Sequence, residues 1–405
     1  MVLFKEALYT ALNSVKSIKQ FEEVDYDNML NRVLAKDIIC IKDLPTFNNS
    51  AMDGYAFKYK DIKNSLKVAA TIYAGDNQDA ILKDNECYKI MTGAKVPSDA
   101  DTIAPKEICE VDSNYIKVLK DINKGNAIRL KGEEQKKGTV LLEKGTILTP
   151  AKIALLASQG ISKVEVFKKI KIAILSTGSE LKEPWEEATE DEVYNINAVN
   201  IKMHLKQYGL DSIYLGSIED NLNKSIKFLS KLKEYNVVIT TGGISSGDAD
   251  FTKEAFIKNG LKELFHGIKV KPGHPTLMGI MDNTFVMAMP GNPLAAILNI
   301  LLLSMPILFK IQGAKDIFYE TITVKNSKDL KLKANRVNIV LGNLIDNKFS
   351  AFKDNKYGSG MITPLTNSRY IALFGEDKSL IKANEEIKVI RLNSSICSDK
   401  FDYIN

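Results

Sequence analysis

Residues 236–255, NVVITTGGISSGDADFTKEA, decide the fold of the central part of this chain. A short, β-rich apolar run at 237–239 enters a loop that holds three glycines and ends in two aspartates, and a helical pattern follows. The stretch therefore predicts a strand, a loop and a helix. A turn of this kind usually serves a ligand.

The glycine loop does not belong to a nucleotide hydrolase. Gly242 and Gly247 stand at the spacing of a P-loop, but Asp248 and Ala249 follow where that motif needs Lys and then Ser or Thr. The backbone N–H groups of the loop could still approach an anion, and its carboxylates would then need a hard cation such as Mg²⁺ beside them. The alternative is that Asp250 only caps the following helix.

The segments around this stretch alternate between strand and helix. Apolar strand-like runs at 172–175 and 213–215 alternate with helical patterns at 198–207 and 222–232 and lead to the strand at 237–239. This order predicts a parallel, doubly wound α/β sheet. Ligands of such sheets bind outside the carboxyl ends of the strands.

Five polar loops marked by Gly or Pro follow strand-like runs, and we expect them at one edge of that sheet. Three bring acids to it, namely Glu180, Asp220 and Asp250. The other two are KPGHP at 271–275 and PGNP at 290–293. Asn292 as N-cap and Pro293 at the first helical position begin an apolar helix over 294–303, whose amino end is suited to an anion. Ordinary αβ connections are the alternative for any one loop.

Outside this part, the sequence does not alternate regularly between strand-like and helical patterns. Residues 1–42 have an amphipathic helical pattern, and 43–135 carry short β-like runs at 66–73, 86–91 and 115–119. Thr149-Pro150 begins a helix over 151–158 that ends at Gly160. Beyond residue 314, runs at 321–324, 338–341, 370–374 and 387–390 predict a small β-barrel or sandwich, with Gly358-Ser359-Gly360 as a hairpin loop.

These patterns predict a multi-domain α/β plus β subunit with a central doubly wound α/β domain. The expected domains are a helical and linker part (1–42 with 136–168), an inserted mainly β domain (43–135), the α/β domain (169–313) and a C-terminal β-barrel-like domain (314–405).

Composition excludes several functions. The 405 residues are 45% apolar and 26% charged with a net charge of +5, as in soluble globular proteins, and no aromatic-interleaved basic stripe points to nucleic acid. Four cysteines without a C-x-x-C pair indicate a reducing compartment. The three histidines form no H-E-x-x-H, so any metal should be hard and oxygen-bound.

Neither a secretion signal nor a membrane span is expected. The first residues carry Lys5 and Glu6 inside a helical period. The longest apolar stretch, 295–309, is interrupted by Asn299, Ser304 and Pro306 and is too short to cross a bilayer. We expect a cytoplasmic protein.

Six motifs carry a family resemblance. PTFNNSAMDGYAF, MTGAKVPSDADT, STGSEL, GGISSGDADFTK, KPGHP and MPGNPLAA occur in the order and spacing of the molybdopterin molybdenumtransferase family, and the chain resembles that family over essentially its whole length. The resemblance implies an elongated homodimer whose site lies between the α/β loops of one subunit and the β domain of the other. It also implies molybdate insertion into adenylylated molybdopterin, with Mg²⁺-dependent hydrolysis that releases AMP, and an upstream molybdopterin adenylyltransferase as a possible partner.

The resemblance also implies site residues. Asp53, Glu180, Asp220 and Asp250 would hold Mg²⁺ or position the attack, with Asp220 and Asp250 as the metal ligands. Molybdate would contact Ser245, Lys271, Arg336 and Ser359, and Asp53 and Thr92 would complete a neighbour's site. The remaining substrate-binding positions would be Thr92, Glu134, Gly242, Gly243, Ser246, Gly247, His274, Pro290, Asn292 and Pro293.

Three departures from the family pattern bear on these roles. His274 stands where Lys is usual, Glu134 where Asp is usual, and Ser179 where Asp is usual. Because imidazole titrates near neutrality, anion binding at His274 would depend on pH. Two alternatives stay open: a non-catalytic molybdopterin-binding scaffold, as with the related domain of gephyrin, and an equivalent enzyme that inserts tungstate.

Overall fold

The computed structural model describes residues 1–76, 81–218, 221–244 and 251–392. The chain forms two compact units. Unit 1 comprises Met1–Ala35, Gly145–Ile153 and Lys163–Asn405, and unit 2 comprises Lys36–Lys144 and Ala154–Ser162. The four domain boundaries expected from the sequence stay a prediction.

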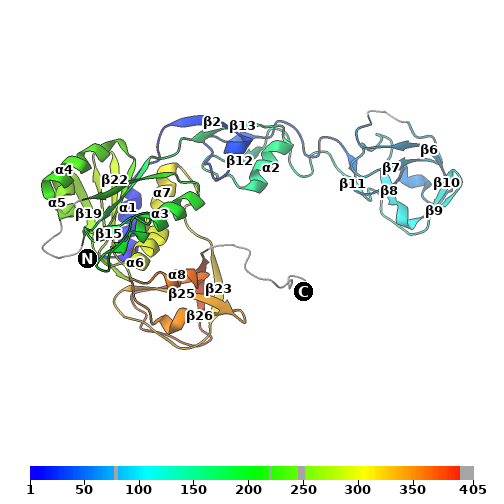
Figure 1. The fold of residues 1–405 in the computed structure, drawn as a ribbon. Coiled ribbons are helices and arrows are strands. Elements are labelled where there is room, and N and C mark those ends of the chain that lie inside the picture. The colour runs from blue at the N-terminus through cyan, green and yellow to red at the C-terminus, as the bar shows by residue number, and fades with distance from the viewer. Residues whose placement is uncertain (77–80, 219–220, 245–250, 393–405) are drawn as a thin grey trace. The chain divides into compact units, whose positions relative to one another are not determined.

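A six-stranded sheet forms the centre of unit 1 (Figure 1). Its order is β17 (Ser212–Ile218), β14 (Ile172–Thr177), β18 (Val237–Thr241), β22 (Thr284–Met289), β21 (Leu277–Met281) and β19 (Leu261–His266). The first four strands run parallel, as predicted, whereas β21 and β19 add an antiparallel pair. Thr241 lies opposite Ser176 on one side and Met289 on the other, so the loops after β14, β18 and β22 leave the sheet at one level.

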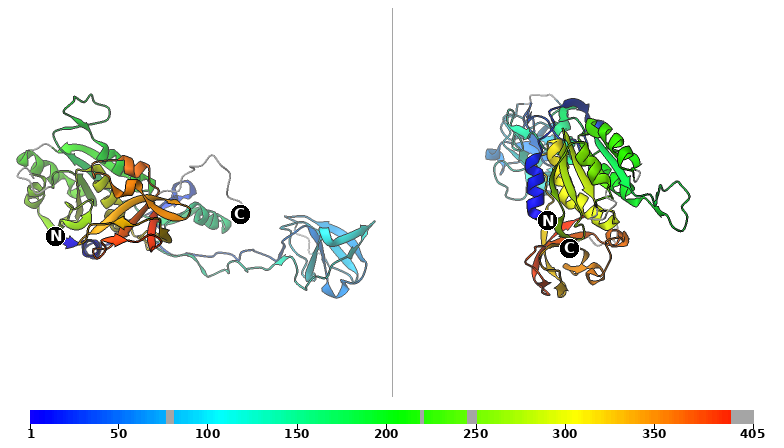
Figure 2. Two further views of the ribbon diagram at one scale, coloured as in Figure 1. Left: turned by 90° about the horizontal axis from the view of Figure 1, so that it is seen from below. Right: turned by 90° about the vertical axis from the view of Figure 1, so that its left-hand side faces the viewer.

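Helices cover both faces of this sheet (Figures 1 and 2). Ile172 and Ile174 of β14 pack in the core cluster of α1 (Phe4–Ser14), α3 (Ile196–Gln207), α6 (Pro293–Asn299) and α7 (Met305–Gln312). Ala173 and Leu175 pack in the opposite cluster with α4 (Leu222–Leu229) and α5 (Phe251–Lys258). Alternate residues of a strand point to opposite faces, so a strand buried on both sides has a continuous apolar sequence.

The expected apolar helix is longer than predicted. α6 continues through a π-helical turn, Ile300–Ser304, into α7, which ends at Gly313 with φ +89°. The π-helical turn allows the helix to run past Pro306 without breaking. The run Pro293–Gln312 is therefore long and apolar enough to cross a bilayer, contrary to the expectation for 295–309, but 89% of its apolar 18-residue window is buried inside the protein.

β20 (Ile268–Lys271) does not join the α/β sheet. It pairs in parallel with β1 (Val2–Leu3) and with β25 (Val337–Ile345) of the C-terminal part. The prediction that the 271–275 loop leaves the same sheet as the others is therefore wrong. Periodicity identified the strand, but its pairing partners lie at both ends of the sequence.

The C-terminal part is a closed barrel, as expected. β25 pairs with β26 (Lys348–Ala351), β26 with β23 (Thr321–Asn326), β23 with β29 (Glu386–Arg391), β29 with β27 (Tyr370–Phe374), and β27 returns to β25. β24 (Leu330–Lys331) pairs with β28 (Leu380–Ile381) beside it. The segment Gly358-Ser359-Gly360 connects the short helix η6 (Phe352–Asn355) to α8 (Thr363–Thr366), so it is not a hairpin loop.

The helical prediction for 1–42 is confirmed only for α1. β2 (Phe21–Asp25) pairs with β13 (Lys163–Phe167), and β3 (Ile38–Ile39) pairs with β12 (Val140–Leu142), while η1 (Tyr26–Asn28) is a short 3₁₀ turn. Exposed and half-buried residues alternate along β2, which is a strand pattern. The predicted helix at 151–158 is α2 (Pro150–Ser158).

The part at 43–135 is mainly β, as predicted. Six of its strands form one sheet in the order β8 (Thr102–Pro105), β5 (Gly54–Phe57), β7 (Glu86–Ile90), β6 (Leu66–Ile72), β10 (Tyr115–Val118) and β9 (Cys109–Asp112). β4 (Asn49–Ser50) pairs with β11 (Ile128–Arg129), and η2 (Tyr59–Asp61) and η3 (Lys106–Ile108) are short turns. Sequence reasoning missed β5, β8 and β9 of this sheet.

Candidate active site

A cavity of about 310 Å³, here the edge cavity, lies at the carboxyl ends of the parallel strands. The loops after β14, β18 and β22 all contribute to it. Of the predicted site residues it brings together Glu180, Gly242, Gly243 and Pro290. Thr177 and Asn197 also line it and were not predicted, and Asn197 Nδ2 donates to the carbonyl of Gly291 at 2.8 Å.

Only glycine fits where the chain leaves β18. Gly242 and Gly243 have φ of +84° and +63°, the left-handed region. A Cβ on Gly242 would stand 2.6 Å from Thr177 Oγ1, and one on Gly243 would stand 2.5 Å from Thr252 Oγ1. The two threonines are buried, so the first turn of the glycine loop is held between β14 and α5.

His266 of β19 also holds this turn. Its Nδ1 accepts a hydrogen bond from Lys253 Nζ at 2.8 Å, so Nε2 carries the proton and donates to the carbonyl of Ile244 at 3.3 Å. Lys253 Nζ also lies 2.9 Å from Glu263 Oε2. Sequence reasoning missed His266, because no motif surrounds it.

Five predicted site residues lie outside the described residues: Asp220, Ser245, Ser246, Gly247 and Asp250. Their roles, and the alternative that Asp250 caps α5, stay predictions. Among the described residues, no three His, Cys, Asp or Glu side chains lie close enough together to hold a metal ion. Glu180 is the one described member of the three acids expected at this edge, so the described residues alone do not form a magnesium site.

A second cavity of about 400 Å³, here the junction cavity, lies between the α/β layer and the barrel. It adjoins the edge cavity, since Pro275 and Pro290 line both. Six predicted substrate-binding residues line it: Lys271, His274, Pro290, Asn292, Arg336 and Ser359. Although β20 belongs to another sheet, its loop therefore reaches the predicted site.

The junction cavity is electropositive. Burial lowers the pKa of Lys271, and the nearby charges of Lys333 and Arg336 lower it further. No carboxylate occurs among the described residues that line this cavity. A cation cluster without a counter-charge is suited to an oxyanion.

The side chain of buried Asn299 holds the 271–275 loop by hydrogen bonds. Its Nδ2 donates to the carbonyl of Gly273 at 2.8 Å and to Thr276 Oγ1 at 2.6 Å. Gly273 has φ +115°, and a Cβ there would stand 2.5 Å from the Asn299 amide. His274 Nδ1 donates to the carbonyl of Ile268 at 3.0 Å, which orients the ring. From the sequence alone, Asn299 is only a polar interruption of an apolar stretch, so its role in the site could not be predicted.

Asn292 takes the predicted N-cap position of α6, but its side chain does not cap the helix. Instead, Asn292 Nδ2 donates to Ser359 Oγ at 3.0 Å, and the backbone N–H of Leu294 donates to the carbonyl of Ser359 at 3.0 Å. Pro293 has no N–H. The amino end of α6 is thus partly occupied by the barrel loop, which corrects the expectation of an open anion site there.

Unit 2 brings Asp53 and Thr92 together. The backbone N–H and the hydroxyl of Thr92 donate to Asp53 Oδ1 at 2.9 and 2.8 Å, and Lys106 Nζ lies 3.6 Å from Asp53 Oδ2. These contacts, the Thr92 N–H foremost, lower the pKa of Asp53 and keep it ionised. Glu134 is exposed, and its backbone N–H donates to the carbonyl of Leu44 at 3.0 Å.

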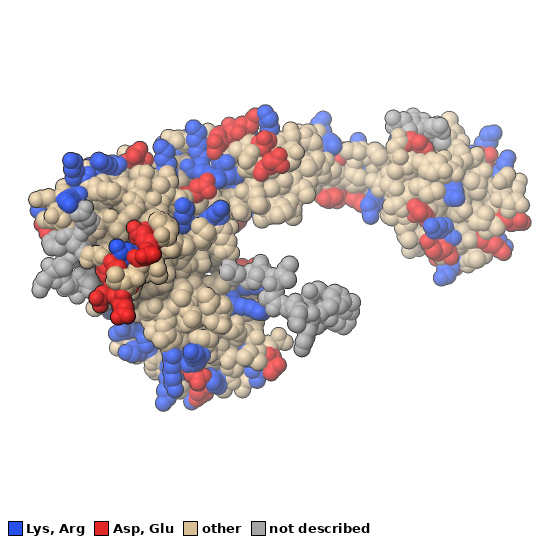
Figure 3. All heavy atoms as spheres, in the orientation of Figure 1, with Lys and Arg blue, Asp and Glu red and all other residues tan. Residues whose placement is uncertain are grey.

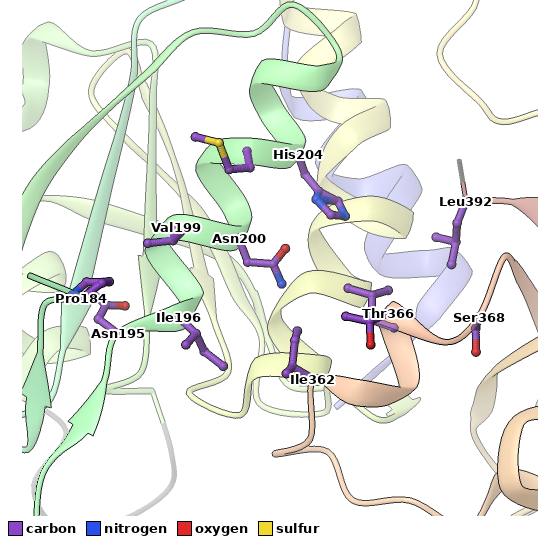
Figure 4. A pocket seen from close by; sticks show the side chains of 12 residues that line it. Pro184, Asn195, Ile196, Val199, Asn200, His204, Ile362, Thr366, Ser368 and Leu392 are labelled. Atoms are coloured by element: carbon purple, nitrogen blue, oxygen red, sulfur yellow. The ribbon is translucent and has the colours of Figure 1, made fainter. Parts of the chain in front are cut away.

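A separate apolar groove of about 430 Å³ lies between α3 and the barrel segment around α8 (Figure 4). Ile196 and Asn200 of α3 face Ile362 and Thr366 across it, and burial lowers the pKa of His204. The groove contains none of the predicted site residues. The edge and junction cavities therefore form the candidate active site.

Comparison with known proteins places this site in a family context. Residues 2–160 match the MoeA N-terminal region (domain I and II), and residues 173–310 match a probable molybdopterin binding domain. The chain is 35% identical over 319 residues to the molybdopterin molybdenumtransferase of Haemophilus influenzae, covering 78% of this chain and 79% of the relative. The enzyme of the same name from Staphylococcus aureus strain COL is 31% identical over 340 residues, with 82% and 80% covered.

The fold has solved counterparts. The crystal structure of the molybdopterin biosynthesis moeA protein from Pyrococcus horikoshii OT3 superposes with a TM-score of 0.82 at 28% identity, covering 96% of this chain and 100% of that one. A second crystal structure, of the molybdopterin biosynthesis moea protein from Pyrococcus horikosii, gives a TM-score of 0.75 at 27% identity, covering 98% of this chain and 100% of that one.

Proposed function

Because the chain belongs to the molybdopterin molybdenumtransferase family, and is thus a transferase of molybdenum cofactor biosynthesis, we propose that it inserts molybdenum from molybdate into adenylylated molybdopterin and releases AMP. The junction cavity is the observation that carries this proposal. It gathers Lys271, Arg336 and Ser359 from distant parts of the chain around a space without a carboxylate.

The cations of the junction cavity would bind molybdate as substrate. Lys271 and Arg336 offset its double negative charge, and the hydroxyl of Ser359 offers a hydrogen bond to one of its oxygens. The two dithiol sulfurs of the pterin would each form a bond to molybdenum, and one molybdate oxygen would leave as water with the two thiol protons. The edge cavity, which adjoins through Pro275 and Pro290, would take the phosphoanhydride end of the pterin substrate.

Release of AMP requires water to attack phosphorus. The water oxygen is added to one phosphorus of the phosphoanhydride, and the bond from that phosphorus to the bridging oxygen breaks. The products are AMP and molybdopterin with its own phosphate, and a proton of the water is released. The backbone around Gly242 and Gly243 would lie against the phosphates, and Glu180 would orient the water or accept its proton. Mg²⁺, when bound, supplies charge neutralisation at the phosphates, and Asp220 and Asp250 would hold it.

The active unit would be a homodimer with a shared site, in which Asp53 and Thr92 of one subunit complete the cavities of the other. The contact of Thr92 with Asp53 supports a shared function for these two residues. An adenylyltransferase would have to supply the activated pterin. The reaction fits the cytoplasm, since Cys40, Cys87 and Cys109 are free thiols and the dithiolene product needs a reducing compartment.

The test mixes the purified chain with adenylylated molybdopterin, Mg²⁺ and molybdate and follows AMP by chromatography. We expect AMP release that depends on molybdate and falls at least about tenfold in Lys271→Gln. Lys388→Gln, an exposed barrel lysine away from both cavities, serves as the matched control. No AMP release under any condition would refute the proposal, and release supported only by tungstate would reassign the metal.

A further inference from the structure

Glu180 reaches the edge cavity on residues 177–182, here the Glu180 loop. This loop begins at the end of β14 and ends with β15 (Leu181–Lys182), which pairs in parallel with β16 (Val193–Tyr194). A Cβ on Gly178 would stand 2.8 Å from both carboxylate oxygens of Glu180, so this acid lies against the turn of its own loop. Because the Glu180 side chain is exposed, its place at the cavity depends on what holds the ends of the loop.

Backbone pairing holds only the second half of the Glu180 loop. The N–H of Val193 donates to the carbonyl of Glu180 at 3.0 Å, and the N–H of Asn195 donates to the carbonyl of Lys182 at 2.7 Å. β15 and β16 form a two-stranded sheet apart from the six-stranded one. Such a short pair is marginally stable by itself. The loop therefore needs an attachment to the central sheet.

The side chain of Asn195, which is 1% exposed, provides this attachment. Its Nδ2 donates to Ser176 Oγ and to Tyr214 Oη, both at 2.8 Å, and lies 3.1 Å from Glu183 Oε1. Ser176 directly precedes the Glu180 loop, and Glu183 directly follows it. One buried side chain thus joins the two ends of the loop.

Tyr214 of β17 completes the network. Its hydroxyl accepts from Asn195 and donates to Glu183 Oε1. Burial raises the pKa of Tyr214, and the hydrogen bond to Glu183 raises it further, so the phenol keeps its proton at neutral pH. β17 pairs with β14 in the central sheet, so the network ties both ends of the loop to that sheet.

The chain needs hydrogen-bond donors at this point because the segment after β15 is acidic. Residues 183–192 carry six acids and no Lys or Arg. Acidic side chains gather on the surface beside β15 (Figure 3). Repulsion among these carboxylates opposes a fixed position of Glu183, and a half-buried carboxylate is costly without donors. Asn195 and Tyr214 supply the donors.

Asn195 also begins helix α3. It is the N-cap, and its Oδ1 accepts the N–H of Ala198 at 3.2 Å. Two residues further on, Asn197 Nδ2 donates to the carbonyl of Gly291 in the loop after β22. The first turn of α3 therefore contacts the loops after β14 and β22, which both line the edge cavity.

We propose that Asn195 is a positioning residue for Glu180: its side chain joins the two ends of the Glu180 loop and thereby fixes the acid at the edge cavity. Asn195 itself lines the apolar groove beside α8 and not the edge cavity, so it acts through the loop and not on the substrate. The inference rests on the proposed function, in which Glu180 orients the attacking water or accepts its proton.

The variant Asn195→Ser separates the two roles of this side chain. Serine still caps a helix but lacks the amide that donates to Ser176 and Tyr214. In the AMP-release assay this variant should lower kcat at least about tenfold and leave KM for molybdate unchanged. Tyr214→Phe, which removes only the hydroxyl, should also lower kcat.

Asn259→Ser is the matched control. Asn259 is 9% exposed, and its Nδ2 donates to the carbonyls of Ala255 and Ile226 at 2.8 and 3.1 Å. It therefore loses the same buried amide, but it lines neither the edge cavity nor the junction cavity. This variant should keep the kcat of the wild-type chain.

A double-mutant cycle shows whether Asn195 acts through Glu180. In a Glu180→Gln background, Asn195→Ser should lower kcat by less than about twofold, because the acid that it positions is already gone. Equal losses in the two backgrounds would overturn the proposal and leave Asn195 as a helix cap.

Amide hydrogen exchange of the full chain without substrate tests the attachment separately from turnover. Peptides that cover 178–183 and 193–195 should exchange about tenfold faster in Asn195→Ser than in the wild-type chain, and at an unchanged rate in Asn259→Ser. If AMP is never released but exchange rises in this way, the proposed function fails and Asn195 still fixes the position of Glu180. Unchanged exchange in Asn195→Ser would overturn the inference even if kcat falls.

Discussion

Asn292 Nδ2 and Ser359 Oγ lie 3.0 Å apart and join the start of helix α6 to a loop of the C-terminal barrel, 67 residues further along the chain. The carbonyl of Ser359 accepts the N–H of Leu294 at the same place. The contact closes one side of the junction cavity. It shows that the α/β layer and the barrel build the candidate site together.

Ser359→Ala should weaken molybdate binding more than it weakens the fold. The change removes the hydroxyl that faces the junction cavity and accepts from Asn292, but the backbone bond from Leu294 remains. We expect molybdate affinity to fall about tenfold and unfolding free energy to fall by no more than about 1 kcal/mol. Dialysis and urea denaturation measure the two effects.

Ser379→Ala is the control for this change, because Ser379 is an exposed barrel serine that lines neither cavity. It should leave affinity and stability as they are. If Ser359→Ala leaves molybdate affinity unchanged, Ser359 only stabilises the junction.

Lys271 should make molybdate binding depend on pH. Its pKa lies below the ordinary 10.5, and only the protonated amine attracts the dianion. The contribution of Lys271 to affinity should therefore be constant at neutral pH and fall as the pH rises through this lowered pKa. Because bound molybdate favours the charged amine, binding at that pH takes up protons, which calorimetry in buffers of different ionisation enthalpy detects.

Lys271→Arg should keep its affinity across the same pH range, since a guanidinium stays charged above pH 12 or so. The same loss in the Arg variant would assign the pH dependence to another group.

Gly243→Ala should destabilise the protein. The new methyl group would meet Thr252 Oγ1 at 2.5 Å, and alanine disfavours φ of +63°. We expect a loss of about 1–3 kcal/mol in the free energy of unfolding, measured in urea. Gly291→Ala is the control on the same cavity, because its methyl group would come no closer than 3.6 Å to Gly242 Cα. An equal loss in both variants would contradict the role assigned to the turn.

His266 should act by positioning the turn at Ile244. His266→Ala removes the donor to the Ile244 carbonyl and should lower kcat for AMP release about tenfold. KM for molybdate should change little, because His266 does not contact the cationic side chains that would bind molybdate. In His266→Gln the side-chain amide can still donate to that carbonyl, and kcat should recover to within about threefold. Equal kcat values for the two variants would show that the loss of kcat does not come from the lost hydrogen bond to Ile244.

Two inactive variants should restore activity when mixed, if the site is shared between subunits. Asp53→Asn and Glu180→Gln would each disable every site of their own homodimer. A mixed dimer would keep one intact site, so random exchange should give about a quarter of wild-type activity. Mixtures that stay inactive after confirmed subunit exchange would place Asp53 and Glu180 in the same subunit's site.

Several elements could be predicted because local pattern is enough to specify them. The continuous apolar runs of β14, β18 and β22 indicate strands buried on both faces, and Pro293 marks the start of the long buried helix. The Gly242-Gly243 pair could be recognised as a special turn from residue type alone. The family resemblance also predicted Lys271, Arg336 and Ser359 as molybdate contacts; all three line the junction cavity, and their role stays a prediction.

Only the tertiary structure decided how distant segments meet. Periodicity indicates that β20 is a strand but not that its neighbours are β1 and β25. For this reason the prediction from sequence that β20 belongs to the α/β sheet is wrong. The roles of Asn299 and His266 come from hydrogen bonds to residues 13 to 26 positions away in the sequence, which leave no local pattern. In the stretch 236–255 the sequence determined a strand, a turn that requires glycine, and a helix. The fold alone determined that His266 and Thr177 hold that turn together with Thr252, because His266 and Thr177 reach it from β19 and β14.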